Sequence, residues 1–237
     1  MTNNRDVWWH EIVQNEQERY CKPEILDSAH PLFILYTSGT TGKPKGVLHS
    51  TGGYLTHLYT TAKLVFDFRP TDIFFSTADV GWVTGHSYTV YGTLMHGITE
   101  IMYEGTPDYP TPDRYWAIVE KHGATILYTT PTALRMYIKY GDNIPMSFDL
   151  SSLRLLGTVG ESINPDVWQW YFKTIGKENC PIIDTWWQTE TGGIMLSHCT
   201  GIEIMPMKPG TAFFPVPGVD LAGVSVIENT LPHNQKG

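Results

Sequence analysis

The chain has 237 residues, 41% of them apolar and 17% charged, which is enough for one large domain or two small ones with a hydrophobic core. Its 16 Lys and Arg against 24 Asp and Glu give a net charge of -8. The absence of a dense basic run argues against a nucleic-acid or anionic-membrane surface. Its three cysteines lack metal-ligand spacing, and no secretory signal or apolar run of about 18 residues is found. We expect a cytoplasmic protein.

The first 30 residues are predicted to form a short helix and a linker, with Trp8 and Trp9 as anchors and a polar run at 14–18. The remaining residues, 31–237, are predicted to form the main domain. From Pro31 onward, short apolar runs alternate with amphipathic stretches. Strands are predicted at 32–36, 73–75, 98–103, 125–128 and 153–159. Helices are predicted at 54–65, 87–96, 113–122, 132–140 and 165–175.

This alternation favours an α/β fold with a mostly parallel sheet flanked by helices, in which ligands bind at loops beyond the carboxyl ends of the strands. After residues 182–184 the pattern changes, because Gly, Pro and Met become frequent. We expect a loop- and β-rich stretch there, ending in a strand-like run at 224–227.

The most informative stretch is residues 36–46, YTSGTTGKPKG, which comes at the end of a strand predicted to be buried. Glycines let backbone N–H groups face an anion, hydroxyls add donors, and Lys43 and Lys45 supply positive charge. The string is not a Walker loop, because only two residues separate its glycines at 39 and 42 and a proline follows its first lysine. The alternative is a solvated turn between two strands. The residue pattern favours a phosphate-binding loop.

This loop resembles the phosphate-binding signature of the adenylate-forming superfamily, which includes acyl-CoA synthetases, luciferases and the adenylation domains of peptide synthetases. Four further strings follow in the order typical of that superfamily. They are DVGWVTGHSY at 79–88, YTTPT at 128–132, GESIN at 160–164 and DTWWQTETG at 184–192. Together they are most similar to the AMP-forming acetate–CoA ligases, so a partial adenylate-forming domain is expected.

The resemblance implies that ATP and acetate form an acyl-adenylate with release of diphosphate, and that the thiol of CoA then attacks it. Glu190 would bind Mg²⁺, a hard cation that prefers oxygen ligands; a solvated loop acid is the alternative. The implied catalytic residues are Thr185, Trp187 and Glu190. The residues implied to hold the β- and γ-phosphates are Thr37, Ser38, Gly39, Thr40, Thr41, Gly42 and Lys43.

By the same resemblance, Gly160, Glu161 and Ser162 form the adenine-binding turn, although Ser162 stands where the family usually has proline. The alternative is an ordinary helix start, and the two interpretations are compatible. The residues implied to continue the nucleotide site are Asp184, Thr185, Trp186, Gln188 and Thr189. Among these, the hydroxyls of Thr185 and Thr189 are candidate donors to phosphate.

The acyl pocket is the most specific inference about the substrate. The residues implied to line it are Trp82, Val83, Thr84, Val159 and Trp187. The indole of Trp187 would fill space that longer acyl chains need, and a filled pocket rejects them sterically. Acetate is therefore the expected substrate, with propionate tolerated.

The likeness covers only the middle of such a ligase. The chain has no Y-x-T-G-D string for the ribose, and the family's mobile carboxy-terminal domain, with its catalytic lysine, has no match. The first hypothesis is a truncated or split ligase, with little activity alone, completed by a companion polypeptide. The second is a nucleotide-binding module without turnover, and the third is a non-functional remnant.

Overall fold

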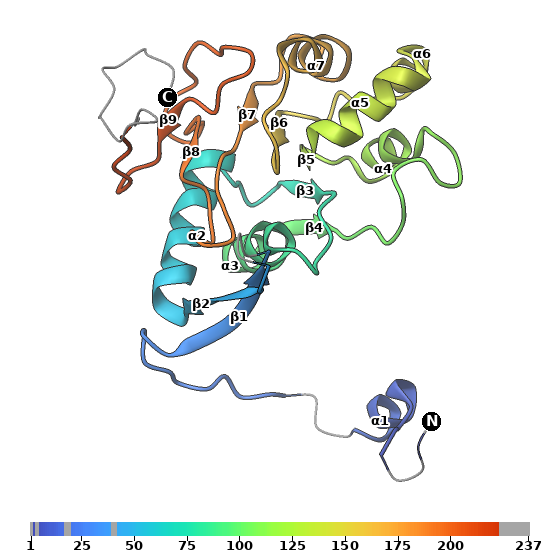
Figure 1. The fold of residues 1–237 in the computed structure, drawn as a ribbon. Coiled ribbons are helices and arrows are strands. Elements are labelled where there is room, and N and C mark those ends of the chain that lie inside the picture. The colour runs from blue at the N-terminus through green and yellow to red at the C-terminus, as the bar shows by residue number, and fades with distance from the viewer. Residues whose placement is uncertain (1, 3–4, 17–19, 39–41, 223–237) are drawn as a thin grey trace.

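The computed structural model describes residues 2, 5–16, 20–38 and 42–222. At its centre lies a parallel five-stranded sheet with the strand order β4-β3-β5-β6-β7 (Figure 1). The strands are β3 (Ile73–Ser76), β4 (Thr99–Ile101), β5 (Ile126–Thr129), β6 (Leu155–Thr158) and β7 (Ile182–Asp184). The predicted α/β fold with a mostly parallel sheet is confirmed.

Helices cover both faces of this sheet, which explains why β5, β6 and β7 are buried at every residue rather than at every second one. Phe75 and Leu156 pack on one face with α4 (Arg114–His122), α5 (Pro131–Tyr140) and α7 (Pro165–Trp170). Their neighbours Phe74 and Leu155 pack on the other face, with α2 (Thr51–Phe66) and the π-helix η1 (Gly85–Tyr91). The remaining helical elements are α3 (Gly92–His96), α6 (Asn143–Met146) and the π-helix η2 (Tyr171–Ile175).

The predicted helices and central strands all occur, with ends that move by a few residues. The strand predicted at 98–103 is confined to β4, and the helices predicted at 87–96 and 165–175 each contain a π-helical segment. Capping explains the sharp start of α5, where the Thr130 hydroxyl accepts a hydrogen bond from the backbone of Ala133 and Pro131 occupies the first turn.

The strand predicted at 32–36 differs from its prediction. It forms β1 (Pro31–Thr37), which pairs only with β2 (Lys45–Ser50) in a separate antiparallel sheet. Its side chains alternate between exposed and half-buried positions, so the prediction of a buried strand is wrong. Leu32 and Phe33 pack against the core, whereas Ile34 and Tyr36 face solvent, because only one face of this hairpin is covered.

The two ends of the chain contain little regular structure. Helix α1 (Trp9–Asn15) lies apart from the rest of the molecule (Figure 1). The expectation that Trp8 and Trp9 anchor it is wrong, because both indoles are exposed, Trp9 by 79%. Near the other end, β8 (Leu196–Ser197) pairs with β9 (Phe214–Pro215) among loops, as expected. The strand-like run predicted at 224–227 lies outside the described residues.

Within the described ranges, every helix is too short or too polar to cross a lipid bilayer.

Candidate functional site

Three of the motifs follow the carboxyl ends of sheet strands. The string at 79–88 begins three residues after the end of β3, that at 160–164 follows β6, and that at 184–192 begins with the last residue of β7. Because parallel strands end at the same edge of a sheet, the fold brings these loops to the edge where ligands bind in α/β proteins.

A hydrogen-bonded network closes the ends of β5, β6 and β7. The Thr158 hydroxyl donates to Asp184 (2.9 Å), and the Thr185 hydroxyl donates to the Thr158 carbonyl oxygen (2.8 Å). Tyr128 in turn donates to the Thr185 hydroxyl oxygen at 2.6 Å. A hydroxyl has a single hydrogen, so that of Thr185 is already directed to protein. The residue ties two strand ends together in this structure.

Asp184 is buried within this network. Burial raises the pKa of its carboxyl, and the hydrogen bonds from Thr158 and from the backbone of Ile163 oppose that rise. Its side chain therefore ties the end of β7 to β6 and to the loop that follows β6.

The turn after β6 leaves its backbone accessible. Gly160 has φ +93°, a conformation that favours glycine, and open space where a Cβ atom would lie. The Glu161 carboxylate points to α5, where it accepts a hydrogen bond from Thr132 and pairs with Arg135 at 2.8 Å. The hydrogen bond from Thr132 and then the Arg135 guanidinium hold the pKa of Glu161 below its usual range. Ser162 is exposed beside them.

The predicted phosphate loop connects β1 to β2. Gly42 has φ +80°, as a tight turn requires of a glycine. Lys43 and Lys45 are exposed, and neither forms an ion pair with a described residue. Thr37 is half-buried and Ser38 exposed. Gly39, Thr40 and Thr41 lie outside the described residues.

The loop after β7 carries the remaining nucleotide and metal candidates. Trp186 is partly exposed, and its backbone N–H donates to Leu196 at 3.0 Å. Gln188 and Glu190 are exposed and Thr189 is half-buried. No three potential metal ligands cluster among the described residues. One exposed carboxylate still fits Mg²⁺, which proteins often bind through one or two carboxylates and the substrate's phosphates.

The residues predicted to line the acyl pocket are only partly brought together. Val159 is buried in the same hydrophobic cluster that Trp187 packs against. Val83 is buried and Thr84 half-buried just before η1. Trp82 is 70% exposed, so the structure does not place it with Val159 and Trp187.

Three side chains that the sequence analysis missed hold the loop after β7. The ring of His49 donates to the Thr189 carbonyl at 2.8 Å, and the Ser87 hydroxyl donates to that of Gly192 at 2.6 Å. The Tyr88 hydroxyl accepts from the backbone of Ile194 at 2.8 Å. The sequence gives a partial indication that Ser87 and Tyr88 contribute to the site, because both belong to the string at 79–88.

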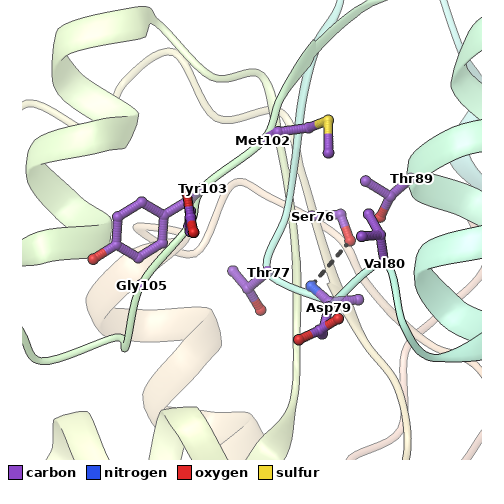
Figure 2. A pocket seen from close by; sticks show the side chains of 10 residues that line it. Ser76, Thr77, Asp79, Val80, Thr89, Met102, Tyr103 and Gly105 are labelled. Atoms are coloured by element: carbon purple, nitrogen blue, oxygen red, sulfur yellow. Dashed lines mark hydrogen bonds between the residues drawn. The ribbon is translucent and has the colours of Figure 1, made fainter. Parts of the chain in front are cut away.

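A cleft of about 550 Å³ opens beside the string at 79–88, between the segments that follow β3 and β4 (Figure 2). Ser76, Thr77 and Asp79 line one side, and Met102 and Tyr103 line the other. The Ser76 hydroxyl oxygen accepts a hydrogen bond from the backbone N–H of Ala78 at 3.3 Å. The cleft thus combines polar and apolar walls at the same edge of the sheet as the motif loops.

Known proteins share much of this sequence. The sequence profile described as "AMP-binding enzyme" matches residues 2–237. The chain is 53% identical to the acetyl-coenzyme A synthetase of Pyrobaculum aerophilum, 56% to that of Streptomyces avermitilis and 57% to that of Rubrobacter xylanophilus. These alignments cover 100%, 100% and 94% of the chain but only 36%, 36% and 34% of the relatives. The chain spans about a third of their length.

Proposed function

We propose that this chain, which belongs to the AMP-binding enzyme family, provides the nucleotide- and acyl-binding part of an AMP-forming acetate–CoA ligase. In the proposed reaction, an acetate oxygen attacks the α-phosphorus of ATP and displaces diphosphate. The thiol of CoA then attacks the acetyl carbonyl and displaces AMP. The observation that carries the proposal is the 53–57% identity to acetyl-coenzyme A synthetases across nearly the whole chain.

The first task of such a site is to bring two anions together, because acetate and the triphosphate repel each other. We assign Thr37, Ser38, Gly42 and Lys43, with the intervening residues 39–41, to the β- and γ-phosphates. The unpaired ammonium groups of Lys43 and Lys45 support this assignment, since no described acid neutralises them. Glu190 would hold Mg²⁺ through its carboxylate, and the ion supplies positive charge at the phosphate oxygens.

The nucleoside would lie against the loops that follow β6 and β7. The exposed backbone of the turn from Gly160 to Ser162 would contact the adenine, and we assign the α-phosphate to the loop after β7. Thr189 is the better hydroxyl donor there, because the hydrogen of Thr185 already binds Thr158. The remaining residues assigned to this nucleotide site are Asp184, Trp186 and Gln188.

The acyl group would contact Val159 and Trp187, with Val83 and Thr84 approaching from the segment before η1. The ring of Trp187 packs edge-on against Tyr88, with centroids 5.4 Å apart. A large ring held by this contact leaves little room for a long chain, which supports acetate over propionate.

The relatives are about three times as long as this chain. We propose that this further sequence contributes to CoA binding and turnover, on the same or a companion polypeptide. All three cysteines are free thiols, which supports a reducing compartment such as the cytoplasm.

Calorimetric titration of the chain with Mg-ATP, and with the propyl phosphate ester of adenosine as an acetyl-adenylate mimic, tests the proposal. We expect saturable binding of both ligands. In a separate thermal-unfolding measurement, each ligand at a hundredfold excess over Kd should stabilise the chain by about 2.7 kcal/mol. The matched control replaces Lys43 and Lys45 by alanine, which should weaken Mg-ATP more than the ester. Failure of the unaltered chain to bind either ligand would overturn the assignment.

A further inference from the structure

The imidazole of His49 connects the β1–β2 hairpin, whose turn is assigned to phosphate, with the loop after β7. His49 belongs to β2, six residues after Lys43, and is only 8% exposed. Its Nε2 atom lies 2.8 Å from the carbonyl oxygen of Thr189. Because a carbonyl oxygen can only accept, Nε2 carries a hydrogen and donates it.

Packing fixes the orientation of this ring. Phe33 from β1 and Tyr54 from α2 contact it, with ring centroids 5.1 and 5.2 Å from that of His49. On the side of the loop, a Cβ atom added to Gly192 would lie 2.8 Å from the His49 ring and 2.9 Å from that of Tyr54. The loop after β7 therefore lies directly against the imidazole.

His49 makes the only hydrogen bond that joins the β1–β2 hairpin to the loop at 185–194 within the described part of the chain. The bonds from Ser87 to Gly192 and from Ile194 to Tyr88 tie the same loop to η1 instead. Among the described residues, this ring is therefore the hydrogen-bonded link between the hairpin that carries Lys43 and the loop that carries Glu190.

We propose that His49 is a positioning residue, which holds the loop of Thr189 and Glu190 in register with the phosphate loop. It does so through its Nε2–H bond to the Thr189 carbonyl. The assignment of these loops to phosphate rests on the proposed function, whereas the effect of His49 on the loop after β7 does not. A ligand that reaches both loops, such as Mg-ATP, should depend on this bond, whereas AMP lacks the β- and γ-phosphates and should not.

Four variants separate the hydrogen bond from the packing. His49→Phe keeps a ring but removes the donor, and His49→Gln keeps an N–H donor at similar reach. His49→Asn is polar but too short, so the Asn and Gln pair decides the question if the Phe variant does not fold. His96→Phe is the matched control, because His96 also binds a carbonyl (Tyr59, 3.0 Å) and stacks on a tyrosine, but joins α3 to α2.

Amide hydrogen exchange of the ligand-free chain is the decisive measurement. We expect residues 188–192 to exchange about two- to tenfold faster in the Phe and Asn variants, the loss expected for one net hydrogen bond. His49→Gln should restore protection, and His96→Phe should leave these amides unchanged. Unchanged exchange in the Phe and Asn variants, or equal acceleration throughout α2 and the loop, would overturn the proposal.

Ligand titrations form the second arm. In the Phe and Asn variants, Kd for Mg-ATP should rise about two- to tenfold while Kd for AMP changes less than about twofold. Equal losses for both nucleotides would contradict selective positioning at the phosphate loops. If the unaltered chain bound no nucleotide, the proposed function would fail, whereas the exchange measurement would still decide the role of His49.

Discussion

At the scale of single residues, Trp187 gives the sharpest test of acyl specificity. Its indole packs against Tyr88 and the cluster that contains Val159. Trp187→Gly removes the ring, so the adenosine ester with a pentyl phosphate chain should bind about tenfold more tightly than it binds the unaltered chain. This follows because each accommodated methylene is worth about 1–3 kcal/mol. The propyl ester should bind more weakly, because it loses contacts.

Calorimetric titration of both esters measures this reversal of preference. Trp170→Ala is the control, because Trp170 packs against the hydrophobic cluster on the other face of the sheet. If the Trp187 variant kept the original order of the two esters, Trp187 would not limit acyl length.

Two glycines in the motif loops predict different costs of adding a methyl group. Gly160 and Gly192 both have positive φ, but only Gly192 has neighbours where a Cβ would lie. Gly160→Ala should lower the free energy of unfolding by about 1–2 kcal/mol, the cost of a left-handed alanine. Gly192→Ala should lower the free energy of unfolding by a further ~1–3 kcal/mol, because the added methyl group would clash with His49 and Tyr54. Urea unfolding of both variants gives the comparison, and equal losses would contradict it.

At the scale of elements, one ion pair joins the starts of β3 and β6 to the end of α2. The Arg154 side chain donates to Asp72 at 2.8 and 2.5 Å and to the carbonyl oxygens of Phe66 and Asp67. Asp72 is buried, whereas Arg154 is partly exposed. Asp72→Asn should lower the free energy of unfolding by about 1.5–3 kcal/mol at neutral pH, because the guanidinium loses its close charged hydrogen bonds and keeps only the longer ion pair to Asp67, at 3.9 Å.

The same pair predicts a dependence of stability on pH. Burial raises the pKa of Asp72, but hydrogen bonds from Arg154, from the Arg69 backbone and from Thr125 outweigh it, and the net pKa lies below its ordinary value. A carboxyl with a lowered folded-state pKa stabilises the fold above its ordinary pKa of about 4, and this contribution disappears as pH falls toward the folded value.

The difference in unfolding free energy between the unaltered chain and Asp72→Asn should therefore be large at pH 7 and shrink below about pH 4. Urea titrations from pH 7 to 3 measure it. A difference that stayed constant over this range would show that the carboxylate charge of Asp72 does not stabilise the fold.

The sequence predicted those features of helices and strands that depend on neighbouring residues, but not those that depend on contacts between distant residues. The run from Ile73 to Phe75 and the run from Leu32 to Tyr36 look alike in sequence, yet one lies in the core sheet and the other in an exposed hairpin. An apolar run specifies extended backbone but not the number of neighbours. Three of the motif strings follow strands of one parallel sheet, whose carboxyl ends share one edge. The bond from His49 to Thr189 joins residues 140 positions apart, which no local pattern reveals.

At the scale of the whole molecule, the α/β fold followed from alternating runs that are covered on both faces, whereas α1 did not follow its expected packing. The indoles of Trp8 and Trp9 lie exposed on a helix apart from the sheet (Figure 1). Apolar composition indicates what could be buried, but burial needs a partner surface within reach. The boundary at residue 30 stays a prediction, and the AMP-binding profile spans both sides of it.

The exposed face of the β1–β2 hairpin gives a prediction for the chain as a whole. Ile34, Tyr36 and Leu48 share this face and are 58%, 67% and 56% exposed. Such an apolar patch should bind a dye such as ANS and promote association. Replacing Ile34 and Leu48 by threonine should reduce dye binding while changing the unfolding free energy by less than about 0.5 kcal/mol per site, as for exposed positions. A loss of several kcal/mol would mean that another surface covers this face in solution.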